Sequence, residues 1–121
     1  MKSILFVDDE PRILEGLQSL LRRYRKRWNM SFAEGGQAAL DALARGHYDV
    51  IVTDMRMPGV DGADVLRHAQ QVQPHAVRIV LSGYSEVESA LRAVPVAHQF
   101  LTKPCDPERL ENVIDRACKL H

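Results

Sequence analysis

The sequence lacks cysteine pairs and long apolar segments. Its two cysteines, Cys105 and Cys118, are too far apart to form a CxxC pair. This spacing argues against a zinc knuckle or a thioredoxin-like motif and predicts two reduced thiols without catalytic duty. The first apolar run, at residues 4–7, is far too short for a signal peptide or a membrane span. We therefore expect a cytoplasmic protein.

The chain also lacks a net charge, because Lys plus Arg and Asp plus Glu each number 16. A balanced charge gives no general attraction to polyanions, so we expect neither direct nucleic-acid binding nor membrane binding. The apolar share of 45% and the charged share of 26% are those of soluble globular proteins. A length of 121 residues predicts that residues 1–121 form a single domain.

Short apolar runs alternate with segments of helical periodicity. The runs predict strands at residues 4–7, 30–33, 50–52, 77–81 and 96–101. The periodic segments predict helices over residues 14–24, 39–43, 65–72, 87–94 and 110–117. Pro11 suits a first helical turn, Gly46 suits a helix end, and Asp106-Pro107 is typical of an N-cap followed by proline.

Strict alternation of strand and helix predicts an α/β fold with a parallel sheet covered on both faces. The expected architecture is a flavodoxin-like (βα)5 doubly wound sheet of five strands. Its strand order would be 2-1-3-4-5, which makes the first and third strands neighbours. Ligands of such sheets bind at the carboxyl ends of the strands.

Polar residues follow the predicted strands at that edge. Asp8 and Asp9 follow the first strand and Asp54 follows the third, while Ser82 and Lys103 follow the fourth and fifth. Three converging carboxylates repel unless a cation, protons or the lysine compensate them. Oxygen ligands without paired His or Cys favour a hard ion, Mg²⁺ first and Mn²⁺ second. A carboxylate beside such an ion is a competent nucleophile toward phosphorus, and Asp54 has these surroundings.

Four motifs together carry a resemblance that runs over essentially the whole chain. They are Asp8-Asp9, TDMRMPGVDG at 53–62, LSG at 81–83 and FLTKP at 100–104. In this order and spacing they resemble the receiver domains of bacterial two-component response regulators, of which the chemotaxis regulator is the best known. The resemblance implies that Asp54 accepts a phosphoryl group. It also implies that Asp9, Asp54 and the backbone carbonyl of Arg56 hold the metal, with Asp8 acting mainly through a metal-bound water.

The resemblance assigns further roles at the ends of the last two strands. Lys103 would pair with the phosphoryl group, and the Ser82 hydroxyl would donate to a phosphoryl oxygen. Phe100 would be an aromatic switch that turns inward as Ser82 moves. The family often has a cis peptide bond before the proline that corresponds to Pro104. Arg56 and Tyr84 differ from the chemotaxis regulator, which leaves the lifetime of the phosphorylated state open.

The resemblance also implies partners. A sensor histidine kinase, a phosphotransfer protein or a small phosphodonor would supply the phosphoryl group. Phosphorylation would shift a pre-existing equilibrium of the face formed by the fourth helix, fifth strand and fifth helix. That face would then bind a second copy, as a homodimer, or control a partner or a fused output domain. The domain would catalyse its own modification and its slow hydrolysis, without turnover of a substrate.

Two other functions stay open at this point. A small phosphatase working through an aspartyl-phosphate would also use Asp, Lys and Mg²⁺, but the chain has no insertion to shape a substrate pocket. A docking module that is never phosphorylated is the other alternative, although the acids and the lysine are all present. Five basic residues lie within positions 22–27, with Tyr24 between them and Trp28 directly after them. This pattern could suggest a nucleic-acid patch. We favour a different role for these basic residues: they lie at the C-terminal end of the first predicted helix and complement its dipole.

Overall fold

One parallel sheet organises the molecule. The computed structural model describes residues 1–83, 87–103 and 106–119. Its sheet has five strands in the order β2-β1-β3-β4-β5, and every neighbouring pair is parallel. The strands are β1 Lys2–Asp8, β2 Trp28–Glu34, β3 Val50–Asp54, β4 Val77–Ser82 and β5 Gln99–Thr102. The predicted fold class and strand order are confirmed.

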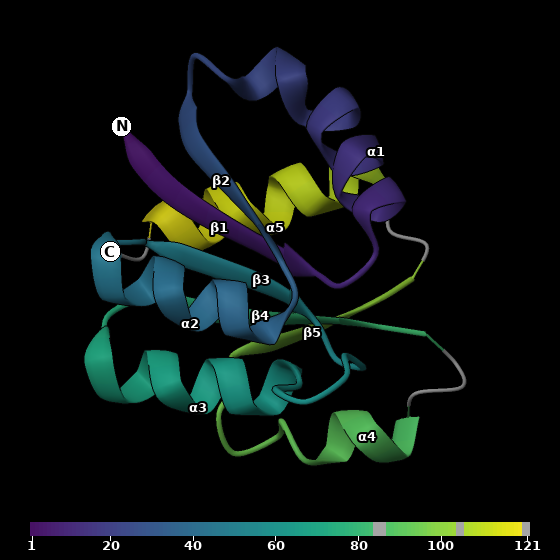
Figure 1. The fold of residues 1–121 in the computed structure, drawn as a ribbon. Coiled ribbons are helices and arrows are strands. Elements are labelled where there is room, and N and C mark those ends of the chain that lie inside the picture. The colour runs from purple at the N-terminus through teal and green to yellow at the C-terminus, as the bar shows by residue number, and fades with distance from the viewer. Residues whose placement is uncertain (84–86, 104–105, 120–121) are drawn as a thin grey trace.

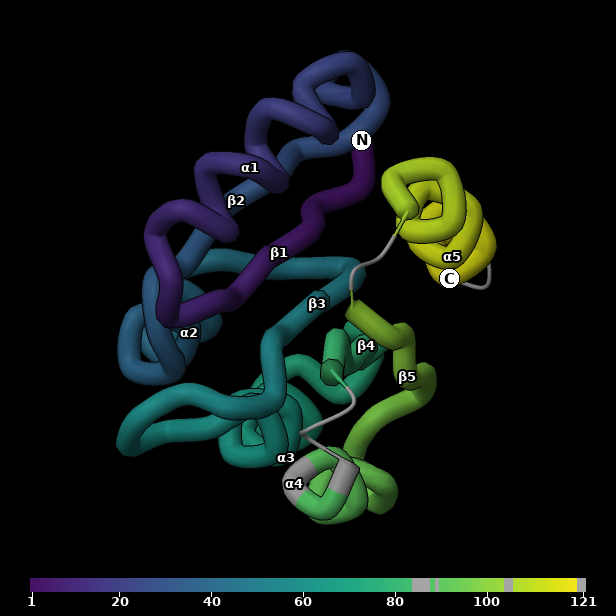
Figure 2. Tube along the Cα trace, turned by 90° about the vertical axis from the view of Figure 1, so that its right-hand side faces the viewer, coloured from purple at the N-terminus to yellow at the C-terminus, as the bar shows by residue number. Residues whose placement is uncertain are grey.

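Helices cover both faces of this sheet. They are α1 Pro11–Leu21 with the short 3₁₀ helix η1 Arg22–Tyr24, α2 Gly36–Arg45, α3 Gly62–Val72, α4 Val87–Leu91 and α5 Pro107–Lys119. Helices α1 and α5 lie on one side of the strands and α2, α3 and α4 on the other (Figure 1), an arrangement that the rotated view also shows (Figure 2). Among the described residues, no helix is long and apolar enough to cross a membrane.

Two apolar layers follow from the period of two along each strand. Ile4 and Phe6 of β1 pack toward α1 and α5, in one cluster with Leu21 and Ile114. The intervening Leu5 belongs to the opposite cluster, which gathers side chains of α2, α3 and α4. Because β1 and β3 are buried on both faces, their sequences are nearly unbroken apolar runs.

The predicted helix ends agree with the structure at three places. Pro11 is the first residue of α1. Gly46 follows α2, and its N–H donates to the carbonyl of Ala42 at 3.0 Å. Before α5, the Asp106 side chain accepts the N–H of Glu108 at 3.0 Å, so it caps the helix as expected.

Two predicted boundaries near residue 95 were wrong. Helix α4 ends at Leu91 instead of continuing to residue 94, and β5 begins at Gln99 instead of residue 96. Pro95 lacks an N–H and disfavours helical geometry in the residue before it, so the chain turns there. Val96 is apolar because it is buried in the core at 6% exposure, and it does not belong to a strand.

Candidate functional site

The carboxyl ends of β1 and β3 bring three carboxylates together. Asp8 ends β1 and is 3% exposed, Asp54 ends β3 and is 4% exposed, and Asp9 follows β1. One oxygen from each of the three lies within 4.8 Å of the others. They meet because β1 and β3 pair directly, with Val7 opposite Thr53. This juxtaposition is the one expected from the strand order.

Backbone contacts hold the two strand ends in place. The Asp8 side chain accepts the N–H of Glu10 at 2.9 Å, and the Asp8 carbonyl accepts the N–H of Gly35 at 2.9 Å. On β3, the Thr53 hydroxyl donates to the carbonyl of Asp54 at 2.9 Å. The position of the acids is therefore set by the sheet and its loops.

The electrostatics of the site oppose full ionisation. The pKa of Asp8 is raised from 3.8 to about 6, mainly by burial and to a lesser degree by the Asp54 charge, against the opposing effects of the Glu10 N–H and Lys103. Such a cluster of carboxylate oxygens, without His or Cys, suits a hard divalent cation. The donor set therefore fits a metal ion that would relieve the repulsion.

Lys103 supplies the nearby positive charge. It directly follows β5, and its Nζ pairs with Oδ1 of Asp54. Its backbone N–H donates to the carbonyl of Ser82 at 2.9 Å, which ties the ends of β4 and β5 together. The structure thus brings an ammonium group from the fifth strand to the buried acid of the third.

The two predicted switch residues, Ser82 and Phe100, lie on β4 and β5. Ser82 ends β4, is partly buried and stands opposite Thr102. Phe100 stands opposite Val80, and its side chain is 39% exposed. Phe100 is thus partly open to solvent, in contrast to the buried Leu101 that follows it in β5.

Some sequence predictions concern residues that the structure does not describe. Tyr84, Pro104 and Cys105 lie outside the described ranges. Cys118 is described as a free, partly buried thiol, and burial raises its pKa. A raised thiol pKa lowers the thiolate fraction, which agrees with a residue without catalytic duty.

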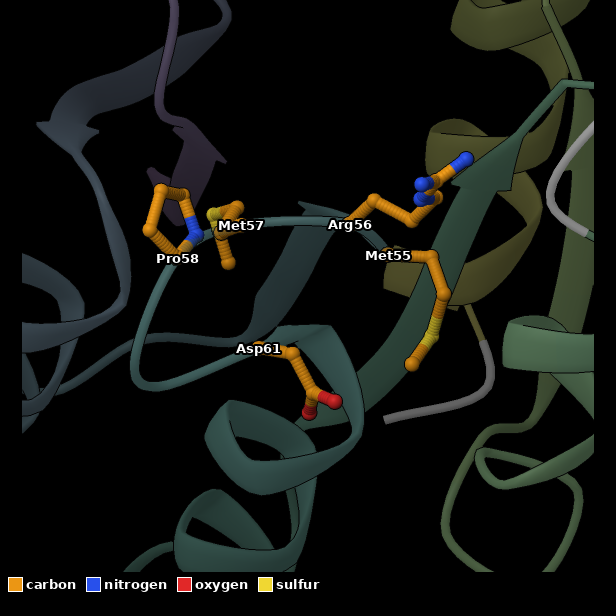
Figure 3. Close-up of a pocket in the computed structure, with 5 residues that line it drawn as sticks. All are labelled: Met55, Arg56, Met57, Pro58 and Asp61. Carbon is orange, nitrogen blue, oxygen red and sulfur yellow. The ribbon is translucent and has the colours of Figure 1, made fainter.

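A loop joins β3 to α3 beside the acids and forms a hollow of about 440 Å³. Figure 3 shows the lining residues, with the exposed Arg56 side chain directed away from Asp61. Met55 and Met57 are buried, at 0% and 7% exposure, and anchor the loop in the core. The two methionines therefore hold the backbone of Arg56 close to the end of β3.

The start of α3 is packed against the acceptor strand. The N–H of Gly62 donates to the carbonyl of Met55 at 2.9 Å. A Cβ at Gly62 would overlap the carbonyl oxygen of Asp54 and the Cα of Met55. Only glycine fits there without displacing these backbone atoms, so α3 begins in direct contact with the backbone of Asp54 and Met55.

Sequence reasoning missed a group of charged residues at the start of α3. Asp61 and Asp64 form a capping box, in which Asp61 accepts the Asp64 N–H at 2.9 Å and Asp64 accepts the Asp61 N–H at 3.2 Å. Arg92, which follows α4, pairs with Asp61. The spacing of the two acids is a readable capping signal. The partnership with Arg92 has no local signal, because the arginine comes from another element.

The basic cluster at residues 22–27 is partly used inside the fold. Arg27 pairs with Glu111 at 2.6 Å and with Asp115, both on α5. Its guanidinium also lies 5.3 Å from the centre of the Trp28 ring. Tyr24 and Trp28 are buried at 7% and 3% exposure, which leaves their rings no open face for a nucleobase. These contacts fasten η1 to α5.

Comparisons with known proteins agree with this geometry. The family model of the response regulator receiver domain matches residues 4–115. The response regulator protein PilR of Pseudomonas aeruginosa is 35% identical over 117 residues, which are 96% of this chain and 26% of PilR. The chain thus spans about a quarter of that relative's length.

Solved structures are similar over nearly the whole chain. The response regulator TrrA of Thermotoga maritima, in complex with Mg²⁺-BeF, has a TM-score of 0.83 and 32% identity, covering 97% of this chain and 99% of TrrA. A signal receiver domain of an HD domain-containing protein from Pseudomonas fluorescens has a TM-score of 0.88 and 28% identity, covering 98% and 87%. The chain belongs to the response regulator receiver domain family, whose members are signalling switches.

Proposed function

We propose that Asp54 is the phosphoacceptor of this receiver domain. The observation that carries the proposal is the buried Asp54 carboxylate, paired with Lys103 and within 4.8 Å of the oxygens of Asp8 and Asp9. An Asp54 oxygen would attack the phosphorus of a donor and form a P–O bond. The bond from phosphorus to the donor's leaving atom would break, and the electron pair would leave with that atom.

A divalent cation fits the acids of this site, Mg²⁺ first and Mn²⁺ second. Asp9, Asp54 and the backbone carbonyl of Arg56 would hold it directly, and Asp8 through water. When bound, the ion would neutralise the charge that gathers on the phosphoryl oxygens during transfer. The raised pKa of Asp8 supports this assignment, because a cation removes the repulsion that burial and the Asp54 charge create.

Lys103 and Ser82 complete the proposed site. The Lys103 ammonium would pass from the Asp54 carboxylate to a phosphoryl oxygen once the acid is modified. The Ser82 hydroxyl would donate to another phosphoryl oxygen, and Phe100 would turn inward behind it. The 39% exposure of the Phe100 side chain supports an outward starting position.

The donor is proposed to be a histidine kinase or phosphotransfer protein, with small phosphodonors as substitutes. A hollow of about 490 Å³ opens beside Asp8 and Lys103, lined largely by apolar residues of α1. Two of these, Ile13 and Leu20, are 45% and 52% exposed. Exposed apolar groups next to a reactive site favour docking of a protein donor.

Residues 1–121 would act as one receiver domain, as a switch without substrate turnover.

The output is proposed to pass through α4, β5 and α5. Leu91 at the end of α4 and Val94 between α4 and β5 in the chain are 64% and 56% exposed, and Phe100 on β5 is 39% exposed. An apolar face of this kind suits a homodimer partner or a fused output domain, whose docking would depend on the state of Asp54.

The test is incubation with acetyl phosphate and Mg²⁺, followed by intact mass measurement. The native chain should gain one phosphoryl group transiently, and Asp54→Asn should gain none. Asp41→Asn, which changes an exposed acid on α2, is the matched control and should behave as the native chain. Continuing turnover of phosphate esters would instead indicate a phosphatase. A lack of any adduct would indicate a docking module.

A further inference from the structure

A charged bridge joins the end of α4 to the start of α3. Nη1 of Arg92 pairs with Oδ2 of Asp61, and Nη2 lies 3.7 Å from Oδ1 of Asp64. The Asp61 side chain is 17% exposed and the Arg92 side chain is 54% exposed, so the pair is shielded from water only on the Asp61 side. One guanidinium therefore engages both acids of the α3 capping box.

The buried apolar side chains that the structure describes in this segment are those of two alanines and one valine. Helix α4 has five residues, and the chain from Arg92 to Val96 forms turns. Its buried side chains include Ala90 and Ala93, at 9% and 0% exposure. Leu91 and Val94 face solvent. At the end of the segment, Val96 is buried at 6% exposure and its carbonyl accepts the Arg78 Nε–H at 2.6 Å, so the Arg92 bridge is one of several contacts that fix this segment.

The α3 side of the bridge is rigid and close to the acceptor. Gly62, the residue after Asp61, packs on the carbonyl of Asp54 with no room for a Cβ. Asp61 is therefore held next to the Asp54 backbone. The bridge connects the short helix α4 to the start of α3, which packs on the strand end that carries Asp54.

We propose that Arg92 is a positioning residue that, through Asp61, holds α4 in the arrangement of the unphosphorylated domain. This inference rests on the proposed function, since it requires a switch at Asp54. Opening the bridge accompanies the switch, so its loss raises the population of the switched arrangement before phosphorylation. A partly exposed ion pair shifts such an equilibrium by about two- to fivefold.

The experiment compares Arg92→Gln with Arg67→Gln. Arg67 pairs with Asp64 at 3.0 Å inside α3, so its loss removes a cation from the same capping box without freeing α4. Two quantities are measured: hydrogen exchange of the amides of residues 90–97 without phosphodonor, and the rate of adduct formation with acetyl phosphate and Mg²⁺. Arg92→Gln should raise both about two- to fivefold. Arg67→Gln should change neither.

Two further comparisons separate an ion pair from a packing effect. About 0.5 M NaCl should bring the native chain toward Arg92→Gln, because salt screens exposed charges. Arg92→Lys should keep part of the native behaviour. In the double variant with Asp61→Asn, which keeps a capping acceptor, the effects should be less than additive.

Each other outcome overturns the inference. Native exchange in Arg92→Gln means that the bridge does not hold α4, and faster exchange without faster phosphorylation means that it does not oppose the switch. Fully additive effects of the two substitutions exclude the Arg92–Asp61 coupling. If the native chain forms no adduct, the proposed function fails, whereas the exchange measurement still decides whether the bridge holds α4.

Discussion

β3 and β5 both direct a site residue to the same edge of the sheet, but from very different surroundings. All five residues of β3 are buried, whereas Leu101 is the buried residue among the four of β5. Asp54 is therefore positioned by packing on both faces of its strand. Lys103 is positioned instead by its own polar contacts, to Asp54 and to the carbonyl of Ser82.

The contrast continues in the helices next to each strand. Helix α3 begins on the backbone of Asp54 through Gly62. Helix α4, which precedes β5 in the chain, is short, and its last residue Leu91 and the nearby Val94 are exposed. An acid on a buried strand next to a lysine that follows a more exposed strand suits the proposed switch at Asp54. In that proposal the acid would stay in place while the β5 side responds to its charge.

The largest expected effect comes from removing the Lys103–Asp54 ion pair, which links the β5 side to β3. Lys103→Gln keeps a polar side chain but removes the charge at Asp54, and the rate of phosphorylation by acetyl phosphate should fall by about 10²- to 10³-fold. Intact mass measured over time gives the rate. Lys26→Gln, at an exposed lysine of the basic cluster, is the control. A rate within about twofold of the native value would mean that β5 contributes nothing to the chemistry.

The next effect tests the rigidity of the β3 side. Gly62→Ala should lower the free energy of unfolding by about 3 kcal/mol, because its methyl group meets backbone atoms that cannot move aside. Gly16→Ala, in the middle of α1 with nothing near its Cβ position, should raise it by about 0.5–1 kcal/mol. On the β5 side, Leu91→Ser should change it by less than about 0.5 kcal/mol. Urea unfolding measures all three, and equal losses at positions 62 and 91 would contradict the comparison.

The smallest effect concerns pH. Because the pKa of Asp8 rises from 3.8 to about 6 on folding, the folded chain holds this proton more tightly than the unfolded chain. Without metal, the free energy of unfolding should fall by roughly 1–3 kcal/mol as the pH rises from about 4 to above 6. Asp8→Asn should flatten this part of the curve, and Mg²⁺ should restore stability at neutral pH. A native curve as flat as that of Asp8→Asn would refute the burial of an ionisable acid.

Much of the β3 side could be predicted from the sequence. Residues 4–7 and 50–52 are unbroken apolar runs, each followed closely by aspartates. Once the chain alternates strands and helices, right-handed crossovers bring those aspartates to one edge. The proximity of Asp8 and Asp54 thus follows from the strand order, and that order could be predicted from the apolar patterns of the sequence.

The β5 side was harder to predict for physical reasons. Val94 and Val96 are both apolar, but one is exposed and the other buried, and Pro95 between them interrupts both helix and strand. Apolar pattern alone cannot separate these cases. The partnership of Arg92 with Asp61 and the raised pKa of Asp8 depend on the folded environment, and no spacing in the sequence encodes them.

The site is assembled from strands that are made at very different times during synthesis. Strands β1 and β3, which carry Asp8 and Asp54, are synthesised early and pair with each other. Lys103 follows β5 and comes 49 residues after Asp54. A nascent chain that ends before β5 would hold its buried acids without their ammonium partner. If Asp54 is the phosphoacceptor, as proposed above, its complete site would form only after β5 has joined the sheet.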